Sequence, residues 1–211
     1  MNAISNPPRH RHKSAVLPEL SVAAGDDPRV LSRFYAASCN LAIWQRSLSS
    51  SLRRYLEQQA QQPPGLSLRC VLRPDEVAPE LERKLPPRAG RDCLIADIKL
   101  LVDMFACLFE QKQVGMRLEW LHRAMCPKFH VDRLPCRLVT TYLGSGTHWI
   151  SHEQRQSSPG NERDFRQLQA GEVALLKGEG WFGNEGRGIV HRSPEVTDDA
   201  GRLFLSLDLM D

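Results

Sequence analysis

The pattern of hydrophobic and polar positions changes from a helical period in the first half of the chain to an alternating period in the second half. Residues 27–35 open with an aspartate N-cap followed by proline at the first helical position. Leucines and a tyrosine repeat at helical spacing over 48–56, and the Gln-Gln-Pro-Pro-Gly that follows ends this helix. The most apolar segment, 92–111, predicts a helix that must be largely covered. We expect Asp97 and Asp103, which interrupt it, to be solvated.

Alternation of apolar and polar residues predicts β-strands in the second half. The segment 202–209 is the clearest, since four leucines form one of its faces while Arg202 and Phe204 belong to the other. This second face borders either a barrel lumen or solvent. Further strands are expected at 66–72, 116–121, 129–133, 136–143, 172–177 and 188–192.

The order of these elements divides the chain into three parts. Residues 1–25 are predicted to be a flexible N-terminal tail, 26–114 a helical part, and 115–211 a strand-rich core on which the helices pack. The proline-rich and charged stretch 74–91 is expected to be a connector. The polar stretch 144–170 has little periodicity and is expected to be a mobile lid or an insertion. The predicted fold class is α+β.

Composition is that of an ordinary soluble protein, and it excludes several classes. The 211 residues suit one domain, with 41% hydrophobic and 25% charged residues. A net charge of +3 is too small to indicate a nucleic-acid partner. The chain has no run of about 18 apolar residues, and its basic N-terminal segment lacks the apolar stretch of a secretory signal. Six cysteines without a Cys-x-x-Cys pair fit a cytoplasmic location better than a disulfide framework.

Candidate chemistry lies in His130-Val131-Asp132 and in a second histidine far downstream, His191. Residues two apart on an extended strand point to the same face, so His130 and Asp132 can bind one ion together. His191 is the only histidine after the strand that begins near Gly171, which makes it the one candidate for a third ligand. Two imidazoles and one carboxylate form the facial triad that holds non-haem Fe(II) and leaves positions open for co-substrate and oxygen.

A second set of ligand types lies in the same region, and it consists of His122, Cys126, His130 and Cys136. Mixed imidazole and thiolate sites are common for Zn²⁺. The spacing matches no familiar zinc finger, and the set leaves Asp132 unexplained. The alternative function that it supports is a non-catalytic metal-binding or zinc-handling protein.

Several short sequence segments follow the His-x-Asp motif in a fixed order. Residues 137–144 read Arg-Leu-Val-Thr-Thr-Tyr-Leu-Gly, and 171–176 read Gly-Glu followed by apolar residues. His191 comes next, and a Gly-Arg pair then enters the last strand. Over residues 115–209 this order resembles the double-stranded β-helix of the Fe(II)/2-oxoglutarate dioxygenases, particularly the prolyl-hydroxylase-like branch. The whole chain also resembles an uncharacterised bacterial family of unknown function.

The resemblance implies a jelly-roll or cupin-like barrel carrying a metal-dependent enzyme. His130, Asp132 and His191 would bind Fe(II), and 2-oxoglutarate would be the co-substrate. The implied activity is hydroxylation of a C–H bond in an unknown substrate, which is a small molecule or a protein side chain. Neither a membrane nor a nucleic acid is indicated as a partner.

Arg202 is implied to pair with the distal carboxylate of 2-oxoglutarate, because a planar guanidinium binds carboxylates in a bidentate manner. Arg187 and Arg192 are rival candidates for this role. Many relatives carry serine or threonine two residues after the arginine, whereas Phe204 stands there in this chain. The missing hydroxyl is expected from Ser206 or from a tyrosine on a neighbouring strand.

That tyrosine is Tyr142, which shares a strand face with Thr140. Both side chains can hydrogen-bond the co-substrate, although ordinary core residues of a strand would show the same pattern. Arg133 and Arg137 flank the metal motif, either as surface residues or as contacts to an anionic substrate.

Overall fold

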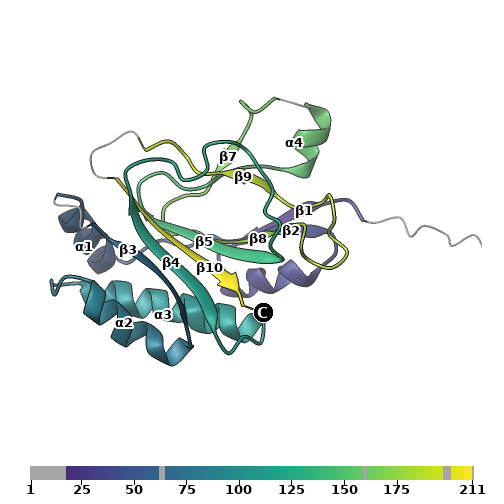
Figure 1. The fold of residues 1–211 in the computed structure, drawn as a ribbon. Helices are drawn as coiled ribbons and strands as arrows, with labels where there is room; N and C mark the ends of the chain where they lie inside the picture. Colours follow the sequence, from purple (N-terminus) through teal and green to yellow (C-terminus); the bar gives the residue numbers. More distant parts are fainter. Residues whose placement is uncertain (1–17, 62–64, 159–160, 197–200, 211) are drawn as a thin grey trace, which may run out of the picture.

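A large and a small β-sheet face each other, and helices cover the outer face of the large sheet (Figure 1). The computed structural model describes residues 18–61, 65–158, 161–196 and 201–210. The large sheet has seven strands in the order β1-β2-β8-β5-β10-β4-β3, and the small sheet has the order β7-β6-β9. The strand bounds are β1 Ser21–Gly25, β2 Cys39–Trp44, β3 Ser67–Leu72, β4 Val114–Leu121, β5 Cys136–Leu143, β6 His148–Ile150, β7 Arg166–Gln167, β8 Val173–Lys177, β9 Val190–Arg192 and β10 Arg202–Leu209.

The helices lie mainly between β2 and β4 in the chain and pack on one side of the large sheet (Figure 1). The helix predicted at 27–35 is present in 3₁₀ form, and its N-cap Asp27 accepts a hydrogen bond from the backbone N–H of Arg29 (2.8 Å). The long apolar helix is also present, and it begins at Arg91 after Gly90. The helix bounds are η1 Pro28–Tyr35, α1 Ser50–Ala60, η2 Pro74–Glu76, α2 Val77–Lys84, α3 Arg91–Leu108 and α4 His152–Ser157.

Alternation along β5 and β10 separates two hydrophobic cores. The leucines at 203, 205 and 207 pack with the helices in the larger core, whereas Phe204 belongs to the core between the sheets. On β5, Tyr142 lies on the helix side and Val139 lies between the sheets. Arg202 is on the same face of β10 as Phe204 and is only 1% exposed. The face of β10 that carries Arg202 and Phe204 therefore borders the lumen between the sheets and not solvent.

The barrel is not confined to the second half of the chain. β1 and β2 pair in parallel, β2 pairs antiparallel with β8, and β3 pairs antiparallel with β4. The predicted helical part 26–114 therefore supplies strands to the large sheet as well as helices. Residues 1–17 of the predicted tail lie outside the described residues, and the rest of the tail contains β1.

Two segments contain more regular structure than the sequence pattern indicated. The stretch 74–91, expected to be a connector, holds η2 and α2. The stretch 144–170, expected to be a lid or an insertion, contributes β6 and β7 to the small sheet and also carries α4. In contrast, the strand expected at 129–133 is reduced to a single bridge between His130 and His191. Within the described ranges, no helix combines the length and the apolar character needed to cross a bilayer.

Candidate metal centre

The side chains of His130, Asp132 and His191 converge although Asp132 and His191 lie 59 positions apart. One ligand atom from each residue lies within 4.8 Å of the other two. The Nε2 atoms of His130 and His191 are each 3.7 Å from a carboxylate oxygen of Asp132. Metal–ligand bonds of about 2 Å require ligand atoms at separations of this order. The structure thus brings together the three residues that the sequence indicated as ligands.

Backbone pairing between the two histidines sets this convergence. The amide of His130 donates to the carbonyl of His191 (3.0 Å), and the amide of His191 donates back (2.9 Å). The amide of Glu179 donates to the carbonyl of Asp132 (2.9 Å), which ties the loop that carries His130 and Asp132 to the glycine-rich segment 178–188. A Cβ at Gly178 would lie 1.9 Å from the carbonyl oxygen of Leu134, so only glycine permits this close approach.

Both histidines present Nε2 to the centre because their Nδ1 atoms face backbone carbonyls. Nδ1 of His130 is 3.0 Å from the carbonyl of Lys128, and Nδ1 of His191 is 3.1 Å from the carbonyl of Ile189. A carbonyl only accepts hydrogen bonds, so Nδ1 carries the proton and Nε2 keeps its lone pair. Burial lowers the pKa of His191, which favours the neutral form that a metal requires.

Arg137 holds the aspartate of the centre in place. Its Nη1 donates to Asp132 Oδ2 (2.8 Å), while its Nε and Nη2 donate to the carboxylate of Asp208 (2.7 and 3.1 Å). Asp132 is largely buried, with 14% of its side chain exposed, so this partner orients the carboxylate and balances its charge. The sequence placed Arg137 near the motif, but the bridging role depends on Asp208 of β10, 71 residues away.

Arg202 is a buried cation without a carboxylate partner among the described residues. Its Nε donates to the carbonyl of Ser145 (2.8 Å), and its Nη2 donates to the hydroxyls of Thr141 (2.9 Å) and Thr147 (3.2 Å). The guanidinium carbon lies 4.4 Å from the ring centre of Phe204. Burial lowers the pKa of Arg202 to about 10, which reflects the cost of enclosing a charge without a counter-ion.

Thr140 and Tyr142 do not reach this centre, which corrects their assignment as contacts of the co-substrate. They lie on the helix-facing side of β5, and the Tyr142 hydroxyl donates to Asp97 Oδ2 (2.7 Å). Asp97 also binds the guanidinium of Arg46 (2.6 and 2.8 Å), so it is not a solvated interruption of α3. The lumen hydroxyl on β5 belongs instead to Thr141, one position along the strand.

The cysteine set expected for the zinc alternative does not come together. Within the part of the chain that the structure describes, His130, Asp132 and His191 are the one group of three potential ligands that converges. Cys136 is 1% exposed in the helix-side core, and burial raises its pKa well above the ordinary value. A thiol in that setting stays protonated, whereas zinc binds the thiolate.

A cavity of about 40 Å³ adjoins two of the candidate ligands, His130 and His191. Phe204, Ser206 and Thr147 are part of its lining, so one hydroxyl candidate from the sequence, Ser206, does face the lumen. Arg192, a rival of Arg202, is part of the lining, whereas Arg202 itself lies behind Phe204 and Thr147 of the lining and is not part of it. The other rival, Arg187, donates to the carbonyl of Pro18 and is not part of the lining. The lining residues are Arg117, Met125, Cys126, His130, Arg137, Val139, Thr147, His191, Arg192, Ser193, Phe204 and Ser206.

Residues 25–208 match the model of a family described as a protein of unknown function, DUF1826. The chain belongs to this family. A comparison with curated protein sequences finds no significant match for this DUF1826 member.

Solved structures of plant dioxygenases have a similar fold. The rice dioxygenase for auxin oxidation is 12% identical and has a TM-score of 0.50, with 91% of this chain and 83% of the rice chain covered. The 2-oxoglutarate binary complex of dioxygenase for auxin oxidation 1 from Arabidopsis thaliana is 11% identical, with a TM-score of 0.52 and coverage of 90% and 92%. At these identities the likeness establishes the double-stranded β-helix fold and nothing finer.

Proposed function

We propose that this protein is a non-haem Fe(II)- and 2-oxoglutarate-dependent dioxygenase of the hydroxylase type. The observation that carries the proposal is the convergence of His130, Asp132 and His191 inside a double-stranded β-helix. A buried, carboxylate-free arginine, Arg202, lies on the lumen face of the adjoining sheet. The Arabidopsis structure of the same fold is a complex with 2-oxoglutarate, which makes this co-substrate the first candidate here.

The donor set fits Fe(II). Two neutral imidazoles and one carboxylate compensate a divalent cation only in part, so a bound metal retains positive charge and open positions for an anionic co-substrate. The Nδ1–carbonyl contacts of His130 and His191 fix the orientation of both rings. Bound Fe(II) would supply the oxygen chemistry that side chains lack.

The protein's own residues would orient and enclose the reactants. Arg137 holds the carboxylate of Asp132, and Arg202, which stays charged at neutral pH with a pKa of about 10, offers its guanidinium to a co-substrate carboxylate. An anion near Arg202 would offset the cost of burying this charge, which the hydroxyls of Thr141 and Thr147 compensate only in part. The core between the sheets keeps bulk water away from Arg202, which is only 1% exposed.

One observation favours a second candidate, a metal-binding protein without turnover. Phe204 stacks on Arg202, and the cavity beside the metal ligands measures only about 40 Å³. That volume suits one or two water molecules, whereas 2-oxoglutarate is much larger. Binding of 2-oxoglutarate therefore requires Phe204 or a neighbouring side chain to move.

Metal analysis followed by an assay for succinate separates the two candidates. Protein loaded anaerobically with Fe(II) is mixed with 2-oxoglutarate and air, and succinate is measured against an Asp132→Ala control. A dioxygenase forms succinate well above the control, even if turnover without the substrate is slow. Protein that retains one equivalent of metal but forms no more succinate than the control would be the non-catalytic metal binder.

A further inference from the structure

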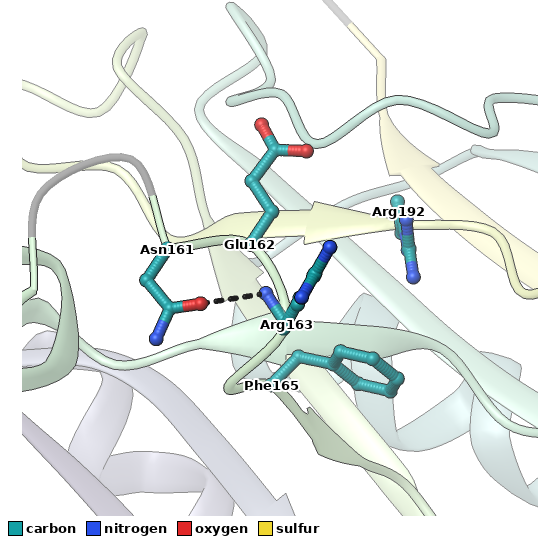
Figure 2. A pocket seen from close by; sticks show the side chains of 5 residues that line it. All are labelled: Asn161, Glu162, Arg163, Phe165 and Arg192. Atoms are coloured by element: carbon teal, nitrogen blue, oxygen red, sulfur yellow. Dashed lines mark hydrogen bonds between the residues drawn. The ribbon is translucent and has the colours of Figure 1, made fainter.

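A hollow of about 820 Å³ opens on the surface next to strand β9. We call it the Arg192 cavity, and its lining is Asn161, Glu162, Arg163, Phe165 and Arg192 (Figure 2). A neighbouring cavity of about 240 Å³ shares Asn161 and Glu162 with it and reaches the metal ligand His130. Arg192 also lines the small cavity that contains both metal-binding histidines. The hollow therefore shares lining residues with two cavities that border the candidate metal ligands.

Arg192 is held by aromatic rings on adjacent sides. Its guanidinium carbon lies 4.4 Å from the ring centre of Phe129 and 5.0 Å from that of Phe165. The two ring centres are 6.1 Å apart, too close for the rings to sandwich the guanidinium, so they form a cradle. Phe165 in turn stacks on His148, with ring centres 4.1 Å apart. The cradle fixes the guanidinium and leaves its other side without an aromatic cover.

The charge of Arg192 is not neutralised by any carboxylate in the described parts of the chain. Its Nε approaches Nδ1 of His148 (3.3 Å), and no described residue accepts from its Nη atoms. Burial first, and then the charges of Arg192 and Arg202, lower the pKa of His148, which favours the neutral imidazole that accepts from Arg192 without cancelling its charge.

A second cation borders the same hollow. The guanidinium of Arg163 has no hydrogen-bond acceptor among the described residues, although its backbone N–H donates to Asn161 Oδ1 (3.2 Å). Figure 2 shows Arg163 and Arg192 bordering the hollow near the ring of Phe165, with the side chain of Glu162 extending away from that ring. Two guanidinium groups without a carboxylate partner among the described residues, against the single carboxylate of Glu162, leave the lining with a net positive charge beside a phenyl wall. Such a site suits an anion carried on a small organic molecule.

We infer that the Arg192 cavity binds the substrate of the metal centre through an anionic group, a carboxylate or a phosphate monoester, paired with Arg192 and Arg163. The inference rests on the proposed function, because it places the rest of the substrate toward His130 and His191. It names a substrate class, small acidic molecules, and a residue that selects it. A neutral molecule of the same size would leave both guanidinium groups unpaired.

The first arm of the test uses the metal-free protein, so it does not depend on the proposed enzyme activity. Benzoate, phenyl phosphate and neutral benzyl alcohol are titrated separately and followed by the proton NMR signals of each probe. Both anions should bind, and Arg192→Gln should weaken them at least about tenfold, since charge-assisted hydrogen bonds are lost. Arg163→Gln should weaken both anions to a smaller extent. The stronger binder of the two anions indicates whether a carboxylate or a phosphate ester is preferred.

Arg166→Gln is the matched control. Arg166 also lies over an aromatic ring, that of Trp149 (5.3 Å), but it does not line the hollow. Its variant should bind the anions like wild type. If benzyl alcohol binds as tightly as the anions, or if both Arg192→Gln and Arg163→Gln bind them like wild type, the inference is wrong.

The second arm adds Mn²⁺ and then 2-oxoglutarate. A probe in the Arg192 cavity should show paramagnetic relaxation from Mn²⁺ at the histidines, and 2-oxoglutarate should not displace it. Stoichiometric displacement would make Arg192 part of the co-substrate site, which overturns the substrate assignment and leaves the proposed function standing. A protein that binds the anions but neither Mn²⁺ nor 2-oxoglutarate would refute the proposed function, and the substrate assignment with it, while leaving an anion site at Arg192.

Discussion

Arginines around the metal centre differ in what neutralises their charge. Arg137 is shared by the carboxylates of Asp132 and Asp208, whereas Arg202 has only hydroxyl and carbonyl acceptors. A cation that is already paired with carboxylates of the protein, like Arg137, stabilises the site in the absence of a ligand. A buried cation that lacks such partners, like Arg202, is stabilised when an anion binds. Arg137 is therefore a positioning residue, and Arg202 is the better candidate for binding a ligand.

Removal of the Arg202 charge should abolish tight binding of 2-oxoglutarate. Breaking a buried charge pair costs about 3–5 kcal/mol, so Arg202→Ala should lower the affinity more than about 100-fold while Mn²⁺ binding survives. Arg202→Lys should also weaken binding, because a point charge replaces the planar fork. The measurement is calorimetric titration of 2-oxoglutarate with Mn²⁺ present and oxygen excluded.

Arg187→Ala serves as the control for this titration, because its guanidinium donates to the carbonyl of Pro18 and shares none of the lumen partners of Arg202. It should bind 2-oxoglutarate like wild type. Wild-type affinity in Arg202→Ala, or no binding to wild type at millimolar 2-oxoglutarate, would refute the co-substrate assignment.

Loss of Arg137 should weaken metal binding without changing any ligand atom. Glutamine at this position cannot bind two carboxylates at once, so Asp132 loses its orientation in Arg137→Gln. Partners of metal ligands typically contribute about 10–100-fold to metal affinity, and a loss of this size is expected. Competition for Mn²⁺ with a chelator of known affinity measures it. An unchanged affinity would mean that Asp132 is positioned by the backbone alone.

The three residues that converge could be picked out from the sequence, because the His-x-Asp spacing and the order of the sequence segments that follow it are local features. The partners of those ligands could not. Arg137 meets Asp208 only when β5 and β10 pair, and Arg202 meets Thr147 only when β6 lies over the end of β10. Such contacts join residues more than 50 positions apart, so a periodic pattern in the sequence cannot predict them.

At the scale of elements, the two faces of β5 have separate roles. Val139 and Thr141 face the lumen, while Thr140 and Tyr142 face the helices. A shift of one residue in an alternating strand exchanges its faces, and the sequence 138–142 is apolar or threonine on both. The assignment of Thr140 and Tyr142 to the co-substrate was wrong because β5 is buried on both sides. The sequence pattern therefore did not show which of its two faces borders the lumen.

Tyr142→Phe tests this assignment of faces. The variant removes the hydroxyl that donates to Asp97 and should lower the free energy of unfolding by about 1–3 kcal/mol. It should leave 2-oxoglutarate affinity unchanged, because the hydroxyl lies on the helix side of the sheet. Urea denaturation measures the first effect and calorimetry the second. Weaker 2-oxoglutarate binding with unchanged stability would place Tyr142 in the lumen instead.

Long, strongly periodic elements were the most predictable ones. β10 was expected at 202–209 and is present over those residues, and α3 differs by a few residues at its ends. β1, β2, β6 and β7 were missed, whereas β9 was expected within 188–192 and is present at Val190–Arg192. β2 is buried along most of its length, so its residues do not alternate, and β6 and β7 are too short to show a period.

At the scale of the whole molecule, the stability of the metal-free protein should depend on pH through its buried histidine. The pKa of His191 is below the ordinary value of 6.5 in the folded state because the side chain is buried. The unfolded chain then takes up a proton at a pH where the folded protein does not. Stability is therefore present above about pH 6.5 and is lost as the pH falls below it.

Thermal unfolding of the metal-free protein at a series of pH values measures this loss. His191→Gln should show a smaller decrease in melting temperature between pH 7.5 and pH 5.5 than wild type, about one pH unit on either side of an unperturbed histidine pKa. The remaining decrease is expected from His148, whose pKa burial also lowers. An equal decrease in wild type and variant would contradict a buried, neutral His191.

The large sheet joins the two halves of the chain, because it contains strands from both of them. Their arrangement gives His130, Asp132 and His191 a shared position that no single segment could provide. The central claim is that these three side chains, and no cysteine, hold one metal ion.

Anaerobic calorimetric titration of Fe(II) into metal-free protein tests that claim most directly, with Mn²⁺ as a redox-stable substitute. Wild type, Cys126→Ser and Cys136→Ser should each bind one equivalent with similar affinity. Asp132→Ala should bind at least about tenfold more weakly, because it loses the only carboxylate of the triad. If the cysteine variants lose the metal while Asp132→Ala retains it, the account is contradicted and the zinc alternative holds.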